Sequence, residues 1–219
     1  ATLFEESRNE LIFDFQFEQS EQEWTAQYTD YATSMDSSSV DFQFEHLSLP
    51  ASINVQRMGL FLGGTNVSDD LFMFVKRQIP ELQPGATYEI RFTIKLASNA
   101  PSGCSGIGGA PGESVFLKGG VSQTEPVSRL DGDHYRLNAD KGNQSQSGED
   151  AVVIGTIANS NRNCESTPYE MVTVHSQNDP LTATADENGH LWFFVGTDSG
   201  FEGRTELFLD SIEIRLRLI

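Results

Sequence analysis

The chain has few basic residues, and this shortage restricts its partners. Its 219 residues contain 14 Lys and Arg against 32 Asp and Glu, which gives a formal net charge of −18. Such an acidic surface repels phosphate backbones, so we expect no nucleic acid as a partner. It attracts divalent cations, although a general acidic coat that keeps an exported or salt-adapted protein in solution explains the charge as well.

Long apolar runs are also missing. No stretch approaches the roughly 20 consecutive apolar residues of a membrane-spanning helix, so no membrane insertion is expected. Residue 1 is Ala rather than Met and no signal peptide is present, which suggests a mature or trimmed chain. A hydrophobic content of 37%, with 15 Phe, is nevertheless enough for a packed core.

Cysteine is scarce, with only Cys104 and Cys164, both in polar segments rich in Gly and Asn. In an exported protein such a pair most readily forms one disulfide between two loops. Two free thiols in a cytoplasmic protein are the alternative. A metal site is not expected, because neither cysteine has another Cys or a His at ligand spacing. We therefore expect a secreted, periplasmic or cell-surface protein.

Helical periodicity with caps is absent, and a period of two takes its place. The clearest example begins after the Pro84-Gly85 turn, where apolar and polar residues alternate up to Leu96. This alternation predicts a strand with one face in a core and the other in water, within an antiparallel sheet that a second layer covers. The apolar positions are Tyr88, Ile90, Phe92, Ile94 and Leu96.

About a dozen short segments show similar patterns and are separated by turns, without helical crossovers. They predict an all-β fold: a single jelly-roll β-sandwich of two antiparallel sheets over residues 1–219, with long loop insertions at about 97–113 and 138–170. The strand from Met58 is expected to end at a Gly63-Gly64 turn. Asn188-Gly189 predicts a hairpin between strands at 181–185 and 190–195.

Three short motifs occur in order along the chain. Phe15-Gln16-Phe17-Glu18 is followed by Trp24, residues 82–88 contain Pro-Gly-x-x-Tyr, and residues 207–214 read Leu-Phe-Leu-Asp-Ser-Ile-Glu-Ile. Together they resemble the galactose-binding-like jelly roll of carbohydrate-binding modules, particularly the xylan- and glucan-binding group. The stretch from 103 to 169 matches nothing in that family, and the chain is longer than its usual members.

The resemblance implies three features. In many members a structural calcium joins the first loop to the last strand through acidic residues, and the matching positions here are Glu18 and Asp210. The resemblance also places Trp24 in the core. It further implies a polysaccharide or another glycan as the ligand.

Asp210 needs a partner on physical grounds as well. By alternation it faces the same side of the last strand as Phe208 and Ile212, where a carboxylate requires a cation, an arginine or backbone donors. The alternatives are a solvent-facing aspartate at a bulge, or an ion pair with Arg215 or Arg217.

Sugar binding requires an exposed aromatic platform beside hydrogen-bonding side chains, because the CH-rich faces of sugars stack on rings. For each aromatic residue the alternative is packing in the core. The segment 196–203 also places Asp198 and Glu202 between glycines, either as a site for a cation or a sugar hydroxyl or as an ordinary connection. The candidate ligand-binding residues are Tyr28, Tyr31, Tyr135, Tyr169 and Trp192.

No catalytic residue can be assigned. The chain has neither an H-E-x-x-H nor a G-x-S-x-G motif, and among 32 acidic residues some pair always suits glycoside hydrolysis. The leading hypothesis is a non-catalytic, calcium-stabilised extracellular carbohydrate-binding module. An extracellular structural or adhesion domain without a sugar ligand is the alternative, and a polysaccharide lyase or hydrolase comes third.

Overall fold

The computed structural model describes residues 2–7, 9–176 and 180–219, and it confirms the predicted all-β sandwich. These residues form sixteen β-strands and one 3-10 helix, η1 (Ser37–Val40), without any α-helix. Within the same residues, no helix is long and apolar enough to cross a membrane. All strand pairs of the sheets are antiparallel.

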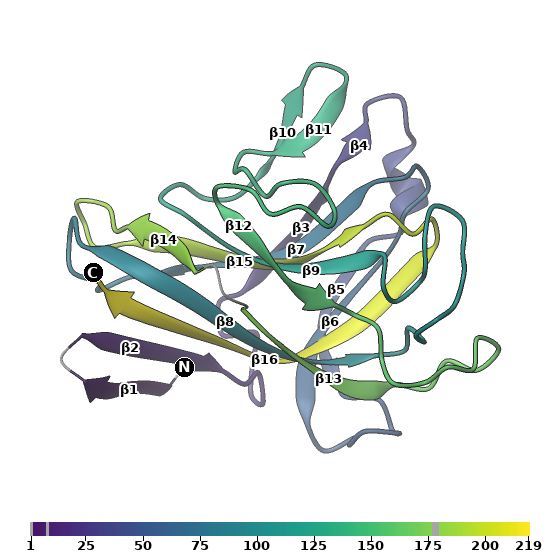
Figure 1. The fold of residues 1–219 in the computed structure, drawn as a ribbon, viewed down its shortest axis with the longest axis horizontal. Helices are drawn as coiled ribbons and strands as arrows, with labels where there is room; N and C mark the ends of the chain where they lie inside the picture. Colours follow the sequence, from purple (N-terminus) through teal and green to yellow (C-terminus); the bar gives the residue numbers. More distant parts are fainter. Residues whose placement is uncertain (1, 8, 177–179) are drawn as a thin grey trace.

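The first sheet is built around the longest strand, β16 (Arg204–Leu218). Along one side β16 pairs with β8 (Thr87–Ser98); on the other side its first half pairs with β6 (Met58–Thr65) and its second half with β2 (Glu10–Phe15). Figure 1 shows β8 and β16 running side by side through the molecule. The outer strands of this sheet are β1 (Thr2–Ser7), β5 (Gln43–Ser48), β13 (Glu170–His175) and β14 (Leu181–Thr184).

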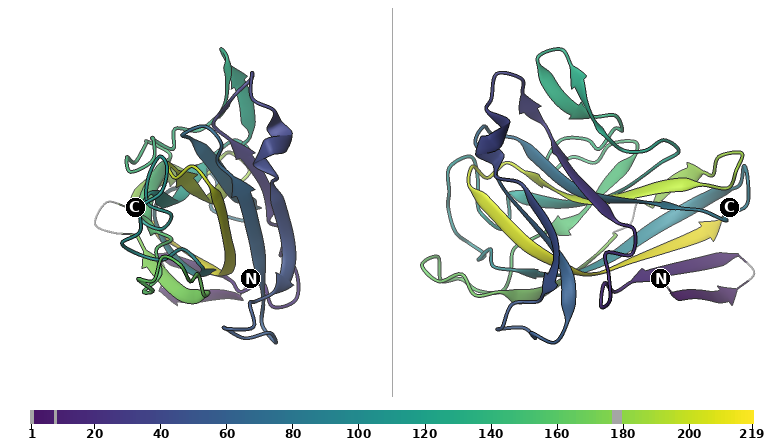
Figure 2. Two further views of the ribbon diagram at one scale, coloured as in Figure 1. Left: turned by 90° about the vertical axis from the view of Figure 1, so that its right-hand side faces the viewer. Right: turned by 180° about the vertical axis from the view of Figure 1, so that it is seen from behind.

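The second sheet packs face to face with the first, and a small third sheet extends from it (Figure 2). The second sheet has the order β12 (Ala151–Thr156), β9 (Val115–Ser122), β15 (Leu191–Ser199), β7 (Leu71–Ile79) and β3 (Thr25–Thr29). The third sheet has the order β10 (Ser128–Asp131), β11 (His134–Leu137) and β4 (Tyr31–Ala32).

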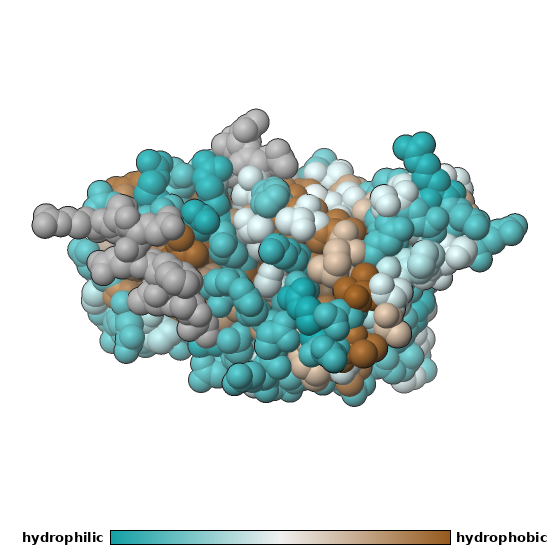
Figure 3. Space-filling model, turned by 90° about the horizontal axis from the view of Figure 1, so that it is seen from below, coloured by the Kyte–Doolittle hydropathy of each residue, from teal (hydrophilic) through white to brown (hydrophobic). Residues whose placement is uncertain are grey.

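The alternation predicted for β8 is confirmed. Each of its predicted inward residues is at most 3% exposed, and they pack against residues of β7 and β15 from the second sheet. Trp24 is also in this core, as expected, with its ring 5.4 Å from that of Phe15 in an edge-to-face contact. By contrast, the surface seen in Figure 3 is mainly hydrophilic, as the acidic composition predicts.

The predicted turn at Gly63-Gly64 is wrong, because β6 continues through both glycines to Thr65. A side chain on Gly64 would place its Cβ 2.5 Å from Sδ of Met73 in the facing sheet. Glycine at this position therefore serves close packing between the sheets rather than a change of chain direction.

The hairpin predicted at Asn188-Gly189 is also wrong. The two flanking strands belong to different sheets, since β14 pairs with β8 whereas β15 pairs with β7 and β9. A tight turn does occur: Gly189 has a φ of 75°, and its carbonyl accepts a hydrogen bond from the Leu82 amide at 2.9 Å. The turn therefore carries the chain from one layer to the other.

The predicted disulfide is confirmed, with an S–S distance of 2.04 Å between Cys104 and Cys164. It joins the loop after β8 to the loop after β12, which are both long and irregular. The insertion predicted at about 138–170 is not one loop, because β12 lies within it and forms an edge of the second sheet.

Removing this disulfide should destabilise the protein. Its cysteines are 60 residues apart, so the bond restricts a large loop of the unfolded chain. The double variant Cys104→Ser/Cys164→Ser should lose about 2–4 kcal/mol of unfolding free energy. Urea unfolding followed by tryptophan fluorescence measures this loss. An unchanged midpoint would show that the loops are held without the bond.

Candidate functional site

The outer face of the second sheet is covered by the segment 137–150, which contributes the site described below. Phe72 and Phe74 of β7 and Phe194 of β15 point away from the main core and form a separate apolar cluster. Leu137 and Ala139 of the covering segment pack against it. Burial of these rings accounts for the position of the segment.

Two oppositely charged side chains lie fully buried beneath this segment. Lys118 of β9 and Asp198 of β15 are both 0% exposed, and Nζ lies 2.8 Å from Oδ2. The strand register places Lys118 opposite Gly196, so that Asp198, two positions further on, projects from the same face. Lys118 also donates hydrogen bonds to the carbonyls of Lys141 and Gln146 at 2.7 and 2.9 Å. A lysine of the sheet therefore holds the backbone of the covering segment.

Lys141 of the covering segment forms ion pairs with two aspartates. Its Nζ lies 2.7 Å from Asp198 Oδ2 and 2.7 Å from Asp30 Oδ2, at the end of β3. Asp198 Oδ2 also accepts a hydrogen bond from the Gln144 amide at 2.8 Å. Burial opposes the charge of Lys141, but the carboxylates of Asp198 and Asp30 outweigh it and raise the pKa of Lys141. We call Asp30, Lys118, Lys141 and Asp198 the buried ion cluster.

Asp70, just before β7, brings a third carboxylate to this cluster. One carboxylate oxygen from each of Asp30, Asp70 and Asp198 lies within 4.8 Å of the others. Burial, followed by the charges of Asp198 and Asp30, raises the pKa of Asp70 to about 8 despite the opposing effect of Lys141. Carboxylates this close do not ionise together readily, so Asp70 holds its proton at neutral pH.

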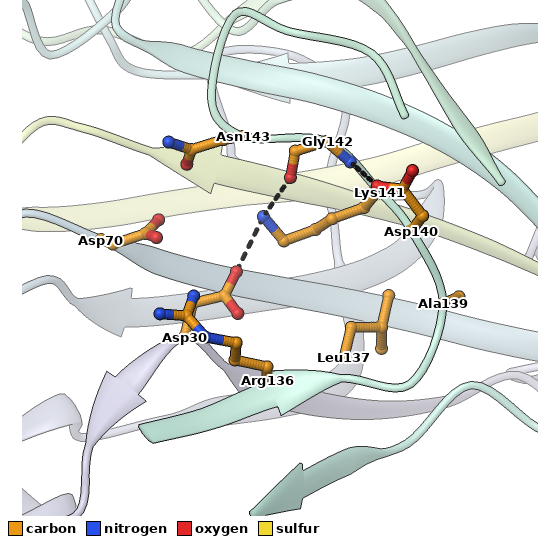
Figure 4. A pocket seen from close by; sticks show the side chains of 9 residues that line it. All are labelled: Asp30, Asp70, Arg136, Leu137, Ala139, Asp140, Lys141, Gly142 and Asn143. Carbon is orange, nitrogen blue, oxygen red and sulfur yellow. Dashed lines mark hydrogen bonds and ion pairs between the residues drawn. The ribbon is translucent and has the colours of Figure 1, made fainter. Parts of the chain in front are cut away.

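Two pockets open beside the cluster and share the wall residues Asp30, Asp70 and Arg136 (Figure 4). The larger, of about 420 Å³, is also bordered by the covering segment from Leu137 to Asn143. The smaller, of about 240 Å³, extends to Tyr31 of β4 and His134 of β11. We call the two pockets together the acid cleft.

Three of the predicted aromatic residues lie next to one another, and one of them, Tyr31, lines the smaller pocket. Tyr31 and Tyr135 are cross-strand neighbours on β4 and β11, with ring centroids 4.9 Å apart and stacked. Tyr28 of β3 lies 5.2 Å from Tyr31, and the Asp30 amide donates to the Tyr135 carbonyl at 2.9 Å. All three rings are half-buried. We call Tyr28, Tyr31 and Tyr135 the tyrosine row.

The other two predicted aromatics lie elsewhere. Tyr169 packs against Phe208 on the outer face of the first sheet, and its hydroxyl is 3.5 Å from Glu206 Oε2. Burial and the Glu206 charge raise the pKa of Tyr169 to about 12. Trp192 is half-buried near the start of β15, opposite Gln78 and Ser122 and far along the strand from Asp198.

The residues implied for calcium do lie close together, but an arginine lies between them. Arg57 Nε is 3.0 Å from Glu18 Oε1, and Arg57 Nη2 is 2.7 Å from Asp210 Oδ1. Asp210 is 1% exposed, and its partner is neither of the arginines expected from the sequence. As arranged, the pair does not fit a calcium ion, because the guanidinium already neutralises both carboxylates. Calcium at Glu18 and Asp210 stays a prediction.

Asp210 also lies at a β-bulge, which overturns the expected orientation of the last strand. The pairing of β16 with β8 shifts between Leu209 and Ser211. Leu209 and Ile212 therefore face the main core, while Phe208 packs on the outer face of the sheet. The alternation does not locate the extra residue, because three apolar residues, Leu207 to Leu209, precede it without a break.

Sequence reasoning missed most of the acid cleft. Asp198 was noted, but in a loop, whereas residues 196–199 belong to β15. Lys118 sits between apolar residues and glycines of β9, and that unusual context is the one signal that pointed to a buried charge. Asp30, Asp70 and Lys141 are ordinary loop residues in the sequence and meet only through the fold.

No family model matches the chain, and no curated protein matches it in sequence. One solved structure with some likeness is a carbohydrate-binding module studied for specific mannan recognition. Its sequence identity is 14% and its TM-score is 0.41, and the match covers 95% of this chain and 98% of that chain. The K1 cleaved adhesin domain of Lys-gingipain from Porphyromonas gingivalis has 11% identity, 93% and 96% coverage, and a TM-score of 0.37.

The enzymatically active domain of tailspike protein 4 from bacteriophage CBA120 has 10% identity and a TM-score of 0.39; the match covers 93% of this chain and 20% of that one. The chain thus spans about a fifth of the tailspike structure. At these identities and TM-scores the three likenesses say nothing about binding, and the fold assignment comes from the strand pairing described above.

Loss of the buried lysine should destabilise the fold. In Lys118→Met the side-chain volume is largely kept, but Asp198 loses one of its two lysines and two carbonyls lose their donor. We expect a loss of about 2–4 kcal/mol in unfolding free energy. Lys95→Met, an exposed lysine on β8, is the matched control and should change it by less than about 0.5 kcal/mol. Equal urea midpoints for the two variants would contradict the role assigned to Lys118.

Because Arg57 neutralises Glu18 and Asp210, added calcium should not raise the stability of the protein. Thermal unfolding should give the same melting temperature with calcium and with EGTA. Arg57→Met should lower the unfolding free energy by about 1–3 kcal/mol, because it leaves the buried Asp210 carboxylate without its cation. A melting temperature that rises with calcium, and no longer does so in Asp210→Ala, would instead establish the predicted calcium site.

Proposed function

We propose that this protein is a non-catalytic carbohydrate-binding module that binds a glycan along the tyrosine row. The observation that carries the proposal is a row of three half-buried tyrosines from three different strands, of which Tyr31 lines a polar cleft. Rings held against one another in this way leave their outer faces and edges as an apolar surface for the CH groups of a sugar.

The acid cleft supplies the hydrogen-bonding groups that a sugar also needs. Arg136 and Asn143 offer donors, and Asp69 and Asp70 offer carboxyl oxygens, at the walls of the two pockets. The larger pocket, about 420 Å³, falls within the range of small-ligand sites, about 300–1,000 Å³. The cleft therefore combines the two chemical features of a carbohydrate site.

The same geometry favours binding over hydrolysis. Glycoside hydrolases hold two carboxyl groups about 5–9.5 Å apart, on either side of the scissile bond. Here the three carboxylates lie within 4.8 Å of one another, and two of them are neutralised by lysines. Asp30 and Asp198 thus support the wall of the cleft, and both are engaged by lysines.

The finer parts of the proposal come from composition and resemblance. The disulfide favours an oxidising compartment, so we place the protein outside the cytoplasm, either secreted, periplasmic or on the cell surface. The resemblance of the sequence motifs makes xylan and β-glucan the first polysaccharides to test.

Removal of the central tyrosine should weaken glycan binding without unfolding the protein. Affinity electrophoresis through a panel of soluble polysaccharides identifies a ligand, and Tyr31→Ala should then bind it about tenfold more weakly, because one stacking ring is lost. Trp192→Ala, at the far end of β15, should bind like the wild type. If Trp192→Ala lost binding and Tyr31→Ala kept it, the site would lie elsewhere on the molecule.

A further inference from the structure

Asp70 is the one carboxylate of the three that lacks a cation. Lys118 pairs with Asp198, and Lys141 pairs with both Asp198 and Asp30. Within the part of the chain that the structure describes, no ion pair reaches Asp70, and its Oδ1 is buried without a hydrogen-bond partner. The fully buried Asp198 Oδ1 beside it has none either. This corner of the cluster therefore has one carboxyl group more than it has cations, and Asp70 keeps its proton where a cation is missing.

The uncompensated carboxyl group is accessible from the cleft. Asp70 lines both pockets, and Tyr31 lines the smaller one with it. In Figure 4 the Asp70 side chain lies across the pocket from Lys141, with Asn143 nearby. A ligand stacked on the tyrosine row can thus reach Asp70 directly.

The other charged groups at the cleft do not supply the cation that Asp70 lacks. Of the basic residues on its walls, Lys141 is already paired with two aspartates, and Arg136 lies 4.0 Å from Asp131. Asp69 and Asp140 add further acidic groups to the same walls. An anionic sugar would meet repulsion here, whereas an ammonium group would gain a carboxylate partner and the faces of tyrosine rings.

We propose that the acid cleft recognises a glycan that carries free amino groups, with one ammonium group bound between Asp70 and the tyrosine row. This inference rests on the proposed carbohydrate function and names the ligand class of the same site. Burial and the neighbouring carboxylates raise the pKa of Asp70, and a bound ammonium group would favour its ionised form. A β-1,4-linked glucosamine oligomer meets the requirement, since it has a glucan backbone and one amine in each residue.

The test compares three oligosaccharides of equal length and linkage: β-1,4-glucosamine, its N-acetylated form and the corresponding glucose oligomer. Isothermal titration calorimetry is carried out at a pH at which the sugar amines are charged. The wild type should bind the amine form about tenfold or more tightly than either neutral form. Asp70→Asn, which keeps the shape but cannot ionise beside a bound ammonium group, should bind all three alike.

A polyamine sugar is also attracted in a general way to a protein of net charge −18, so the control must remove an acidic side chain outside the cleft. Glu187→Gln removes one negative charge from an exposed turn at the other end of β15, and it should keep the wild-type preference. Equal effects of Asp70→Asn and Glu187→Gln would overturn the inference. The melting temperature of Asp70→Asn should stay close to that of the wild type, because an uncharged amide replaces a carboxyl group that holds its proton at neutral pH.

Two further results separate the possible failures. If the wild type binds the three oligosaccharides equally, the amine inference fails and carbohydrate binding stands. If no glycan of a wider panel binds, the proposed function itself fails. Magnesium or calcium chloride that displaces the glucosamine oligomer, or that raises the melting temperature of the wild type and not of Asp70→Asn, would assign Asp70 to a metal ion and overturn the inference.

Discussion

A single carboxylate oxygen, Oδ2 of Asp198, connects the two layers that form the acid cleft. It forms ion pairs with Lys118 of the sheet and with Lys141 of the covering segment. It also accepts a hydrogen bond from the Gln144 amide of that segment. Each partner lies within 2.8 Å, in a place that water does not reach. A buried carboxylate is stable only when it is paired and hydrogen-bonded, so the sheet and the segment depend on each other here.

This constraint explains how an irregular segment can form a wall. Residues 138–150 have no strand of their own, and their contacts with the aromatic rings of the second sheet are non-directional. The charged groups add direction, because they specify which two carbonyls lie over Lys118 and which amide lies over Asp198. The segment therefore keeps Asn143 and the Lys141 ammonium group in defined positions at the larger pocket.

A second buried carboxylate of the fold is also neutralised by a basic side chain from a loop. The bulge at Asp210 places a carboxylate among buried residues, and Arg57 from the loop before β6 neutralises it together with Glu18. The Cys104–Cys164 disulfide holds two further long loops. These irregular regions of the sandwich are thus tied by specific contacts, and the regular strands are held by apolar packing. The tyrosine row is held in a similar way, by the hydrogen bond that the Asp30 amide donates to the Tyr135 carbonyl.

The sequence by itself determined the all-β class, the buried face of β8 and the cysteine pairing. These are local properties, since alternation with period two and the scarcity of cysteine can be read without knowing which strands are neighbours. The same local reasoning failed at Gly64, at Asn188-Gly189 and at the Asp210 bulge. At those places the facing sheet or the pairing partner decides the conformation.

Only the tertiary structure brought together the acid cleft. Asp30, Asp70, Lys118, Lys141 and Asp198 are distributed over most of the chain, and none of them stands in a motif. Their charges affect one another only at a separation of a few ångströms in a medium from which water is excluded. That separation depends on the order of strands in the second sheet and on the path of the segment above it, and no periodicity in the sequence encodes either one.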